Sequence, residues 1–351
     1  MTPLERVVAT LTGQKPDRVP VILYYQSMLQ RDLQFLDYTW EEALWHPRKL
    51  FQAVERQYTE YEFDNFFLPC DFRIEGEALG SKVGYTLKTG GGMRMGFIKD
   101  WVVKEPKDVL KLKPADPEKD GRMPVVLETI KRLRRKYPDV GIAGFVEGPP
   151  DTATDVYAGH YKGFFVEIVR NPKFLHDLLE VVTESAINYA KAMIGAGAAA
   201  IATVESMIDE AVSPDQYEEF VIPYHRKIRD AIAPVPYVFH QCEDATPFFD
   251  LIVNKVEPAV VAFHEQVDFK WAKEKYGDKV ILAAGPAVSK AGNNLVHGTP
   301  EDVIKEVRHY LDIGMPGGKF WLTASCEVHH DVKPENLKAL VQAARLYGTY
   351  N

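Results

Sequence analysis

Short apolar runs that alternate with amphipathic segments are the feature that most constrains the fold of this chain. The apolar runs are residues 19–25, 65–71, 141–148, 198–205, 234–242, 260–265, 280–286 and 319–326. Most of them are apolar without alternation, which is typical of parallel strands covered on both faces. The segments between them carry apolar residues at helical spacing, and helices are expected over residues 39–58, 171–197 and 213–232, among others.

Eight strands alternating with helices predict an α/β fold of the (β/α)8 TIM-barrel kind, with residues 1–351 as one domain. A doubly wound open sheet is the alternative, because a count of strands does not prove closure. Residues 80–105 break the alternation and indicate two short strands around a glycine-rich tip. We expect a β-hairpin inserted after the second strand, serving either as a lid over the site or as a plain surface hairpin.

The composition limits the classes of function. The formal net charge of -8 gives no general attraction to nucleic acid. No run of about 18 apolar residues and no apolar signal segment is found, so a cytoplasmic protein without a membrane contact is expected. Three cysteines suit a reducing compartment and leave each one free to be a core residue, a ligand or a nucleophile. Small-molecule chemistry is therefore the expected function.

The candidate site lies where the strands end, because barrel enzymes build their sites at the carboxyl ends of the strands. His240 and Cys242 are two residues apart on one expected strand and so point to the same side, and Cys326 ends the last strand. One imidazole and two thiolates form a typical zinc donor set, to which Glu265 could add a displaceable fourth oxygen. The alternative is a buried His–Cys pair with an unrelated third cysteine, and Cys70 is assigned to the core.

Other polar residues at the strand ends are candidates for catalysis or substrate binding. Asp71 could be a general acid, a hydrogen-bond acceptor or a helix cap. Glu147 and Glu205 could orient a ligand histidine or bind substrate, although solvated loop carboxylates are the preferred interpretation.

Aromatic residues near the expected mouth form a second group. Tyr157 and His160 begin an aromatic stripe that is typical of a helix core but could line a pocket for a flat substrate. Tyr24 and Tyr25 end the first apolar run and are expected to face the same pocket.

Four stretches of the sequence carry a family resemblance. Residues 11–21 (LTGQKPDRVPV), 71–85, 213–228 and 333–344 resemble the uroporphyrinogen decarboxylase superfamily, in order and over essentially the whole chain. Asp71 matches the aspartate of the decarboxylases, but Ala324-Ser325-Cys326-Glu327 stands where they carry a glycine-histidine-glycine. The loop after residue 24 contains a single arginine, whereas a porphyrinogen with many carboxylates needs several cations. Decarboxylation of uroporphyrinogen is therefore not expected.

The chain resembles more closely the second branch of that superfamily, the corrinoid-dependent methyltransferases. This branch includes methylcobamide:coenzyme M methyltransferases and methyl-ether demethylases, and its thiol-methylating members bind zinc through a His-x-Cys and a later cysteine. The resemblance implies that His240, Cys242 and Cys326 bind Zn²⁺, with Glu265 beside the metal. It also implies a corrinoid (cobalamin) carried on a small partner protein, and a homodimer. Glu243 departs from the family, which often has glycine there.

The expected reaction is methyl transfer between a small substrate and the cobalt of the corrinoid protein. A methoxylated aromatic substrate, and hence O-demethylation, is preferred because no arginine or lysine is evident at the strand ends to bind the sulfonate of coenzyme M. One alternative is methyl transfer from the corrinoid to a thiol of the coenzyme M type. Another is a barrel that binds a tetrapyrrole or corrinoid without turnover.

Overall fold

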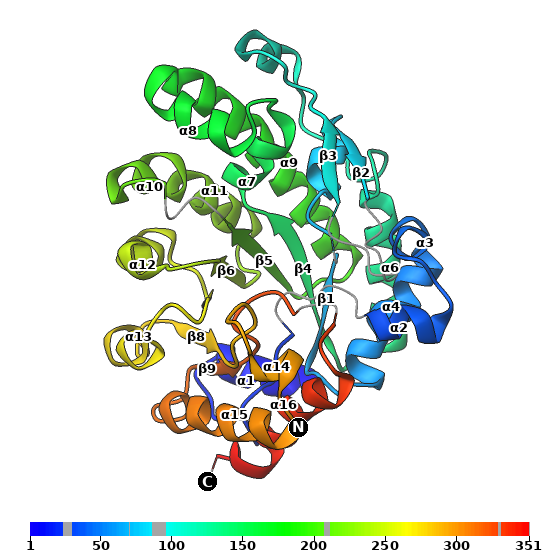
Figure 1. Cartoon of the computed structure of the whole chain (residues 1–351), viewed down its shortest axis with the longest axis vertical. Helices are drawn as coiled ribbons and strands as arrows, with labels where there is room; N and C mark the ends of the chain where they lie inside the picture. The colour runs from blue at the N-terminus through cyan, green and yellow to red at the C-terminus, as the bar shows by residue number, and fades with distance from the viewer. Residues whose placement is uncertain (24–29, 70, 86–95, 207–210, 329–330, 351) are drawn as a thin grey trace.

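The central element of the computed structural model is a sheet of seven parallel strands with helices around it (Figure 1). The structure describes residues 1–23, 30–69, 71–85, 96–206, 211–328 and 331–350. The strands follow one another in the order β1 (Asn65–Leu68), β4 (Gly141–Glu147), β5 (Ala200–Glu205), β6 (Tyr237–Gln241), β7 (Val260–Phe263), β8 (Ile281–Ala284) and β9 (Phe320–Leu322). Each of these strands lies within one of the apolar runs of the sequence, so those seven strand predictions are confirmed.

The first apolar run joins the two edges of this sheet without forming a regular strand over residues 19–23. Val21 makes a parallel bridge with Leu322 of β9. On the other side, the amide nitrogen of Leu23 donates to Asn65 Oδ1 at 2.7 Å, and Asn65 Nδ2 donates to the Leu23 carbonyl at 2.8 Å. A side-chain amide thus replaces the backbone ladder at this position, and the segment takes the eighth place in the ring.

The helices lie outside the sheet, and two of the expected ones are divided. The expected helix over residues 39–58 is broken before Pro47 into α3 (Trp40–Trp45) and α4 (Pro47–Thr59), because the residue preceding a proline avoids the helical conformation. The expected helix over 213–232 is likewise divided into α10 (Pro214–Phe220) and α11 (Ile222–Ile232). The long helix α9 (Pro172–Ala196) is confirmed, and it ends at Gly197, whose φ of 123° suits glycine.

The remaining helical segments complete the outer layer. They are α1 (Pro3–Leu11), α2 (Gln30–Leu36), α5 (Ile74–Ala78), η1 (Pro106–Lys111), α6 (Met123–Lys136), α7 (Pro149–Val156), α8 (His160–Arg170), η2 (Thr246–Phe248), α12 (Phe249–Leu251), η3 (Ile252–Val256), α13 (Phe269–Tyr276), α14 (Asn294–His297), α15 (Pro300–Gly314) and α16 (Pro334–Tyr347). The part of the chain that the structure describes contains no helix with the length and hydrophobicity of a membrane span.

The inserted hairpin is present after β1. Strands β2 (Lys82–Gly84) and β3 (Phe97–Asp100) pair antiparallel to each other and form a separate small sheet. The expected tip of the hairpin lies in residues 86–95, outside the described residues, so the lid remains a prediction.

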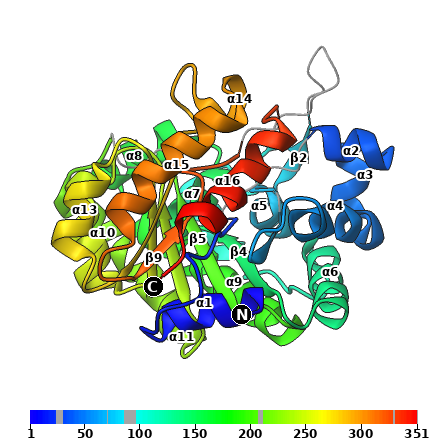
Figure 2. The same ribbon diagram turned by 90° about the horizontal axis from the view of Figure 1, so that it is seen from below.

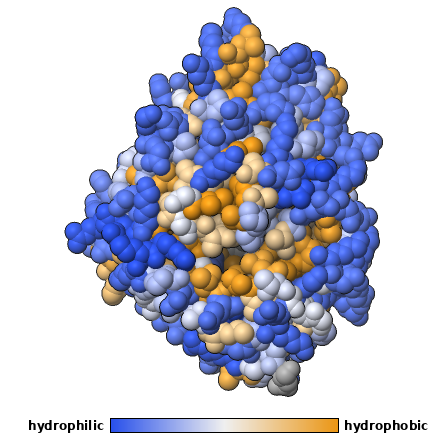
Figure 3. Space-filling model, turned by 180° about the vertical axis from the view of Figure 1, so that it is seen from behind, coloured by the Kyte–Doolittle hydropathy of each residue, from blue (hydrophilic) through white to orange (hydrophobic). Residues whose placement is uncertain are grey.

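The two ends of the strands differ in character. Figure 2 shows α1 at one end of the strands and α14, which follows the carboxyl end of β8, at the other. On the amino-terminal side an apolar cavity of about 270 Å³ lies between α1 and the first residues of β4 and β5. Apolar side chains surround a hollow on the face shown in Figure 3, which is the face opposite to that of Figure 1.

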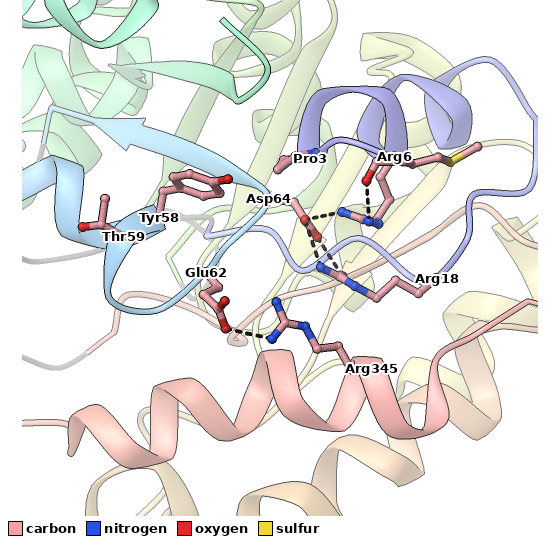
Figure 4. Close-up of a pocket in the computed structure, with 9 residues that line it drawn as sticks. Pro3, Arg6, Arg18, Tyr58, Thr59, Glu62, Asp64 and Arg345 are labelled. Atoms are coloured by element: carbon pink, nitrogen blue, oxygen red, sulfur yellow. Dashed lines mark hydrogen bonds and ion pairs between the residues drawn. The ribbon is translucent and has the colours of Figure 1, made fainter. Parts of the chain in front are cut away.

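An ion-pair network also holds the amino-terminal side together. The buried carboxylate of Asp64 accepts hydrogen bonds from Arg6 Nη1 at 2.7 Å and Arg18 Nη1 at 2.8 Å, and Arg6 also pairs with Asp17. Figure 4 shows both guanidinium groups pointing at Asp64 beside a cavity of about 400 Å³. Because Asp17 and Arg18 belong to the first stretch that carries the family resemblance, this stretch has a structural role far from the strand ends.

Candidate metal centre

Three soft donor side chains meet at the carboxyl ends of the strands. His240 lies in β6, Cys242 follows the end of β6, and Cys326 follows β9. One ligand atom from each residue lies within 4.8 Å of those of the other two, and the two Sγ atoms are 3.6 Å apart. His240 is 1% exposed and both cysteines are partly buried. The structure thus brings together the three residues that were predicted to converge.

Backbone contacts between neighbouring strands explain the convergence. The amide nitrogen of Cys242 donates to the Glu205 carbonyl at 2.9 Å, which continues the pairing of β6 with β5 beyond the end of the strand. On the other side, the amide nitrogen of Ser325 donates to the Pro286 carbonyl at 3.0 Å and so places Cys326 beside the end of β8. The next residue after Cys242 is Glu243, whose φ of 56° is left-handed. A left-handed residue at this turn explains why glycine would suit the position.

The pKa values of the two thiols shift in opposite directions. The hydrogen bond with Cys326 and burial raise the pKa of Cys242 well above its usual value. The hydrogen bond from Cys242 lowers the pKa of Cys326 well below its usual value, and the neighbouring His240 adds to this effect. The favoured arrangement of the pair is therefore a thiolate at Cys326 that accepts a hydrogen bond from the thiol of Cys242.

Glu265 contacts Ser325, the residue before Cys326, but it is not one of the group whose ligand atoms lie within 4.8 Å of one another. Its Oε1 accepts hydrogen bonds from Ser289 and from the amide nitrogen of Lys290, and its Oε2 accepts one from Ser325 Oγ. Burial opposes ionisation, but the hydrogen bonds from Ser325 and Ser289 outweigh it and lower the pKa of Glu265 to about 2. Since Ser325 precedes Cys326, Glu265 braces the loop that carries this cysteine.

Asp71 is buried and fully engaged by donors. Its Oδ2 accepts from Tyr85 Oη and from Arg122 Nη1, each at 2.5 Å, and its Oδ1 accepts from the amide nitrogen of Arg73 at 3.1 Å. Asp71 is not the cap of α5, because the N-cap residue is Arg73 and no side chain caps this helix. Acceptance of hydrogen bonds is therefore the role of Asp71 that the contacts show.

The preferred interpretation of Glu147 and Glu205 as solvated loop carboxylates is wrong. They are 2% and 0% exposed, and each is the last residue of its strand. Glu205 Oε1 lies 2.6 Å from Nε2 of His225, so the histidine that it orients is His225 and not His240. Burial raises the pKa of both carboxyl groups.

Sequence reasoning missed three charged residues beside these carboxylates. Arg73 Nη1 lies 2.5 Å from Asp155 Oδ1 and 3.4 Å from Glu147 Oε1, so the expectation that no arginine lies at the strand ends is wrong. Asp151 Oδ2 accepts from both the amide nitrogen and the hydroxyl of Ser206, at 2.6 and 2.7 Å. The spacing of Asp151 and Asp155 on α7 was the available signal, since residues four apart share one face of a helix.

The predicted aromatic pocket residues are only partly described. The hydroxyl of Tyr157 donates to Glu167 at 3.2 Å and its ring packs edge-on against Phe174, which agrees with the helix-core alternative. The ring of His160 contacts Trp101, and burial and the charge of Arg73 lower the pKa of His160. Tyr24, Tyr25 and Cys70 lie outside the described residues.

The fold and the cluster define a class: a parallel α/β barrel with a buried imidazole–dithiol group at the carboxyl ends of its strands. Residues 2–347 match the family described as uroporphyrinogen decarboxylase (URO-D), and the chain belongs to this family.

Individual relatives cover almost the same length as the chain. It is 27% identical to the methylcobamide:CoM methyltransferase MtbA of Methanosarcina acetivorans, over 99% of this chain and 98% of that protein. It is 25% identical to a methylated-thiol–coenzyme M methyltransferase of Methanosarcina mazei, over 98% of this chain and 89% of that protein. Among solved structures, a methyltransferase from Methanosarcina mazei superposes with a TM-score of 0.87 at 26% identity, with 99% of each chain covered. This likeness supports the TIM-barrel prediction.

Proposed function

We propose that this protein is a zinc-dependent methyltransferase that moves a methyl group from a methylated corrinoid protein to a small thiol. The observation that carries the proposal is the convergence of His240, Cys242 and Cys326 on one point at the strand ends. The similar proteins are named as methyltransferases of methylcobamide and coenzyme M, and they match nearly the full length of the chain. These names favour the thiol alternative over O-demethylation, which was preferred from the sequence.

The donor set suits zinc. One nitrogen and two sulfurs leave one position of a tetrahedral ion for a substrate, as in catalytic zinc sites. A zinc ion held by His240, Cys242 and Cys326 would lower the pKa of a coordinated thiol and so supply a nucleophile near neutral pH. The chain's own residues supply the geometry: the Glu205 carbonyl holds Cys242, and Glu265 holds the Cys326 loop through Ser325.

In the proposed reaction, the methyl acceptor (a thiol) and the methyl donor (a methylated corrinoid protein) must both reach the candidate metal centre. A corrinoid on the partner protein would supply the methyl group. The thiol sulfur would form the new bond to the methyl carbon, and the electron pair of the broken carbon–cobalt bond would stay with the corrinoid. The thiol proton is released to solvent. Atoms and charge balance without a further oxidant or reductant, so no other co-reactant is required.

The ligand assignment predicts the effect of single substitutions. Cys242→Ser, Cys326→Ser and His240→Ala each remove a donor, so each variant should lose its zinc and lose methyl transfer from methylcobalamin to a thiol by more than about 100-fold. Metal analysis of the purified protein and a spectrophotometric assay of methylcobalamin consumption measure the two effects. His309→Ala, at an exposed position of α15, is the control and should keep both. One equivalent of zinc retained by the Cys242→Ser/Cys326→Ser double variant would contradict the assignment.

The direction of transfer is tested with two substrate pairs. Methylcobalamin with a thiol should give the methyl thioether and reduced cobalamin. Reduced cobalamin with a methoxybenzoate should give no methylcobalamin above the background rate. The opposite result would support O-demethylation.

A further inference from the structure

Beside the candidate metal centre lies a group of buried carboxyl side chains that the proposed chemistry does not use. They are Glu75, Glu147, Asp151, Asp155 and Glu205, all at most 2% exposed. Each has one buried carboxylate oxygen without a hydrogen-bond partner among the described residues. Among the described residues, the guanidinium of Arg73 forms ion pairs with two members of this group, Asp155 and Glu147.

Five buried carboxyl groups therefore lie close together with one guanidinium group, that of Arg73, paired to them among the described residues. Burial, together with the charge of neighbouring carboxylates, raises the pKa of Asp155 to about 6, of Asp151 to about 7 and of Glu75 to about 8. A buried oxygen without a donor costs free energy, and a buried charge without a counter-charge costs more. An ammonium group would supply both a positive charge and three N–H donors.

This carboxyl group lies close to the sulfurs of the metal centre. The carboxylate of Asp151 accepts hydrogen bonds from the amide and the hydroxyl of Ser206. The residue before Ser206 is Glu205, whose carbonyl accepts a hydrogen bond from the amide of Cys242. Asp151 is thus linked to Cys242 by two side-chain hydrogen bonds to Ser206 and one backbone hydrogen bond of Glu205. A small molecule at the metal centre is therefore within the electrostatic reach of Asp151.

An anionic acceptor would meet an unfavourable environment. The sulfonate of coenzyme M would need a cation, but the guanidinium of Arg73 is already shared by Asp155 and Glu147. Bringing a further negative charge among buried carboxylates costs free energy, whereas a positive charge is stabilised there. The charge balance around this site thus favours a cationic acceptor.

From the orphaned oxygens of Asp151, Glu147 and their neighbours beside the Cys242–Cys326 pair, we propose that the methyl acceptor is an aminothiol. Its ammonium group is bound by the buried carboxylates and its sulfur is directed to the metal centre. This inference rests on the proposed thiol methylation and names the class of its substrate.

Three two-carbon thiols that carry a cationic, a neutral or an anionic group on the second carbon test the inference on the intact zinc-loaded protein. Cysteamine is cationic, 2-mercaptoethanol is neutral and 2-mercaptoethanesulfonate (coenzyme M) is anionic at neutral pH. With methylcobalamin as donor and the uncatalysed rate of each thiol subtracted, kcat/KM should decrease in that order. The difference between the cationic and anionic thiols should be about tenfold or more, mainly through KM. A higher kcat/KM for coenzyme M than for cysteamine would overturn the inference.

Variants link the preference to the carboxylates. Asp151→Asn keeps the shape and should lower the ratio of kcat/KM for cysteamine to kcat/KM for 2-mercaptoethanol by about threefold or more. Glu147→Gln provides the same test if the first variant does not fold. Asp177→Asn, on the exposed side of α9 and paired with Lys173, is the matched control and should retain the full preference.

The failure of the inference differs from the failure of the proposed function. Equal turnover of the three thiols, or an equal decrease for all three in Asp151→Asn, overturns the aminothiol but leaves thiol methylation in place. No methylation of any thiol above background overturns both.

Discussion

At the residue scale, several buried carboxyl groups have fewer hydrogen-bond donors and cations around them than their oxygens could accept. They are Glu75, Glu147, Asp151, Asp155 and Glu205. Glu75 Oε1 accepts the amide proton of Glu147 at 2.7 Å, but its Oε2 is among the buried oxygens without a partner in the described part of the chain. Such a group favours its protonated form in the folded state, as the raised pKa of about 8 for Glu75 shows. Glu75, Asp151 and Asp155 were missed in the sequence because a glutamate or aspartate on a short helix is more often solvated, and burial depends on tertiary packing.

A pH dependence of stability follows for Glu75. Between the ordinary glutamate pKa of 4.5 and the folded pKa of about 8, the folded chain keeps a proton that the unfolded chain has released. The stabilisation that comes from this proton on Glu75 is therefore fully present below pH 4.5. The free energy of unfolding falls as the pH rises from there through the folded pKa of about 8. Glu75→Gln keeps the acceptor without the charge, so its Tm should exceed that of the wild type by about 2 °C or more at pH 8.

The comparison of thermal unfolding at pH 5 and pH 8 measures this effect. The advantage of Glu75→Gln should be larger at pH 8 than at pH 5, and the exposed control Glu184→Gln should show no such difference. A constant difference between Glu75→Gln and the wild type at both values would reject the explanation.

At the element scale, the site depends on close approach of neighbouring strands at their carboxyl ends. The strands were predictable because buried parallel strands are apolar on both faces, a pattern that is visible in the sequence. The breaks before Pro47 and at Val221 were not predicted, because amphipathic spacing continues across them. The contacts of Glu265 could not be predicted either, since the hydroxyls of Ser289 and Ser325 that donate to it follow other strands.

Gly285, which follows β8, tests the strand approach. A Cβ atom there would lie 1.6 Å from the carbonyl oxygen of Thr323, so Gly285→Ala must push apart the segments after β8 and β9. We expect a loss of about 1–3 kcal/mol of stability and weaker zinc retention, because Cys326 follows on the displaced segment. Gly195→Ala is the control, since a Cβ at that helical position meets nothing within 4 Å. Wild-type stability of Gly285→Ala in urea unfolding would contradict this account.

At the scale of the whole molecule, one ring of strands brings together residues that are far apart in the chain. Cys242 and Cys326 are separated by 84 positions, and the parallel order β6-β7-β8-β9 places both at the same end of the barrel. This part of the site could be predicted because it depends only on the strand order: in a closed barrel, the carboxyl ends of all strands lie at the same end. The side-chain contacts around it could not, because they depend on loops and helices whose packing has no periodic signal.

The central claim is that His240, Cys242 and Cys326 bind one zinc ion with a position open to a thiol. Zinc K-edge X-ray absorption spectroscopy of the purified protein measures this most directly. The account predicts two sulfur neighbours at about 2.3 Å and a histidine nitrogen at about 2.0–2.1 Å, with one more sulfur after a thiol is added. A zinc shell without sulfur, or a sulfur count unchanged by the thiol, would contradict it.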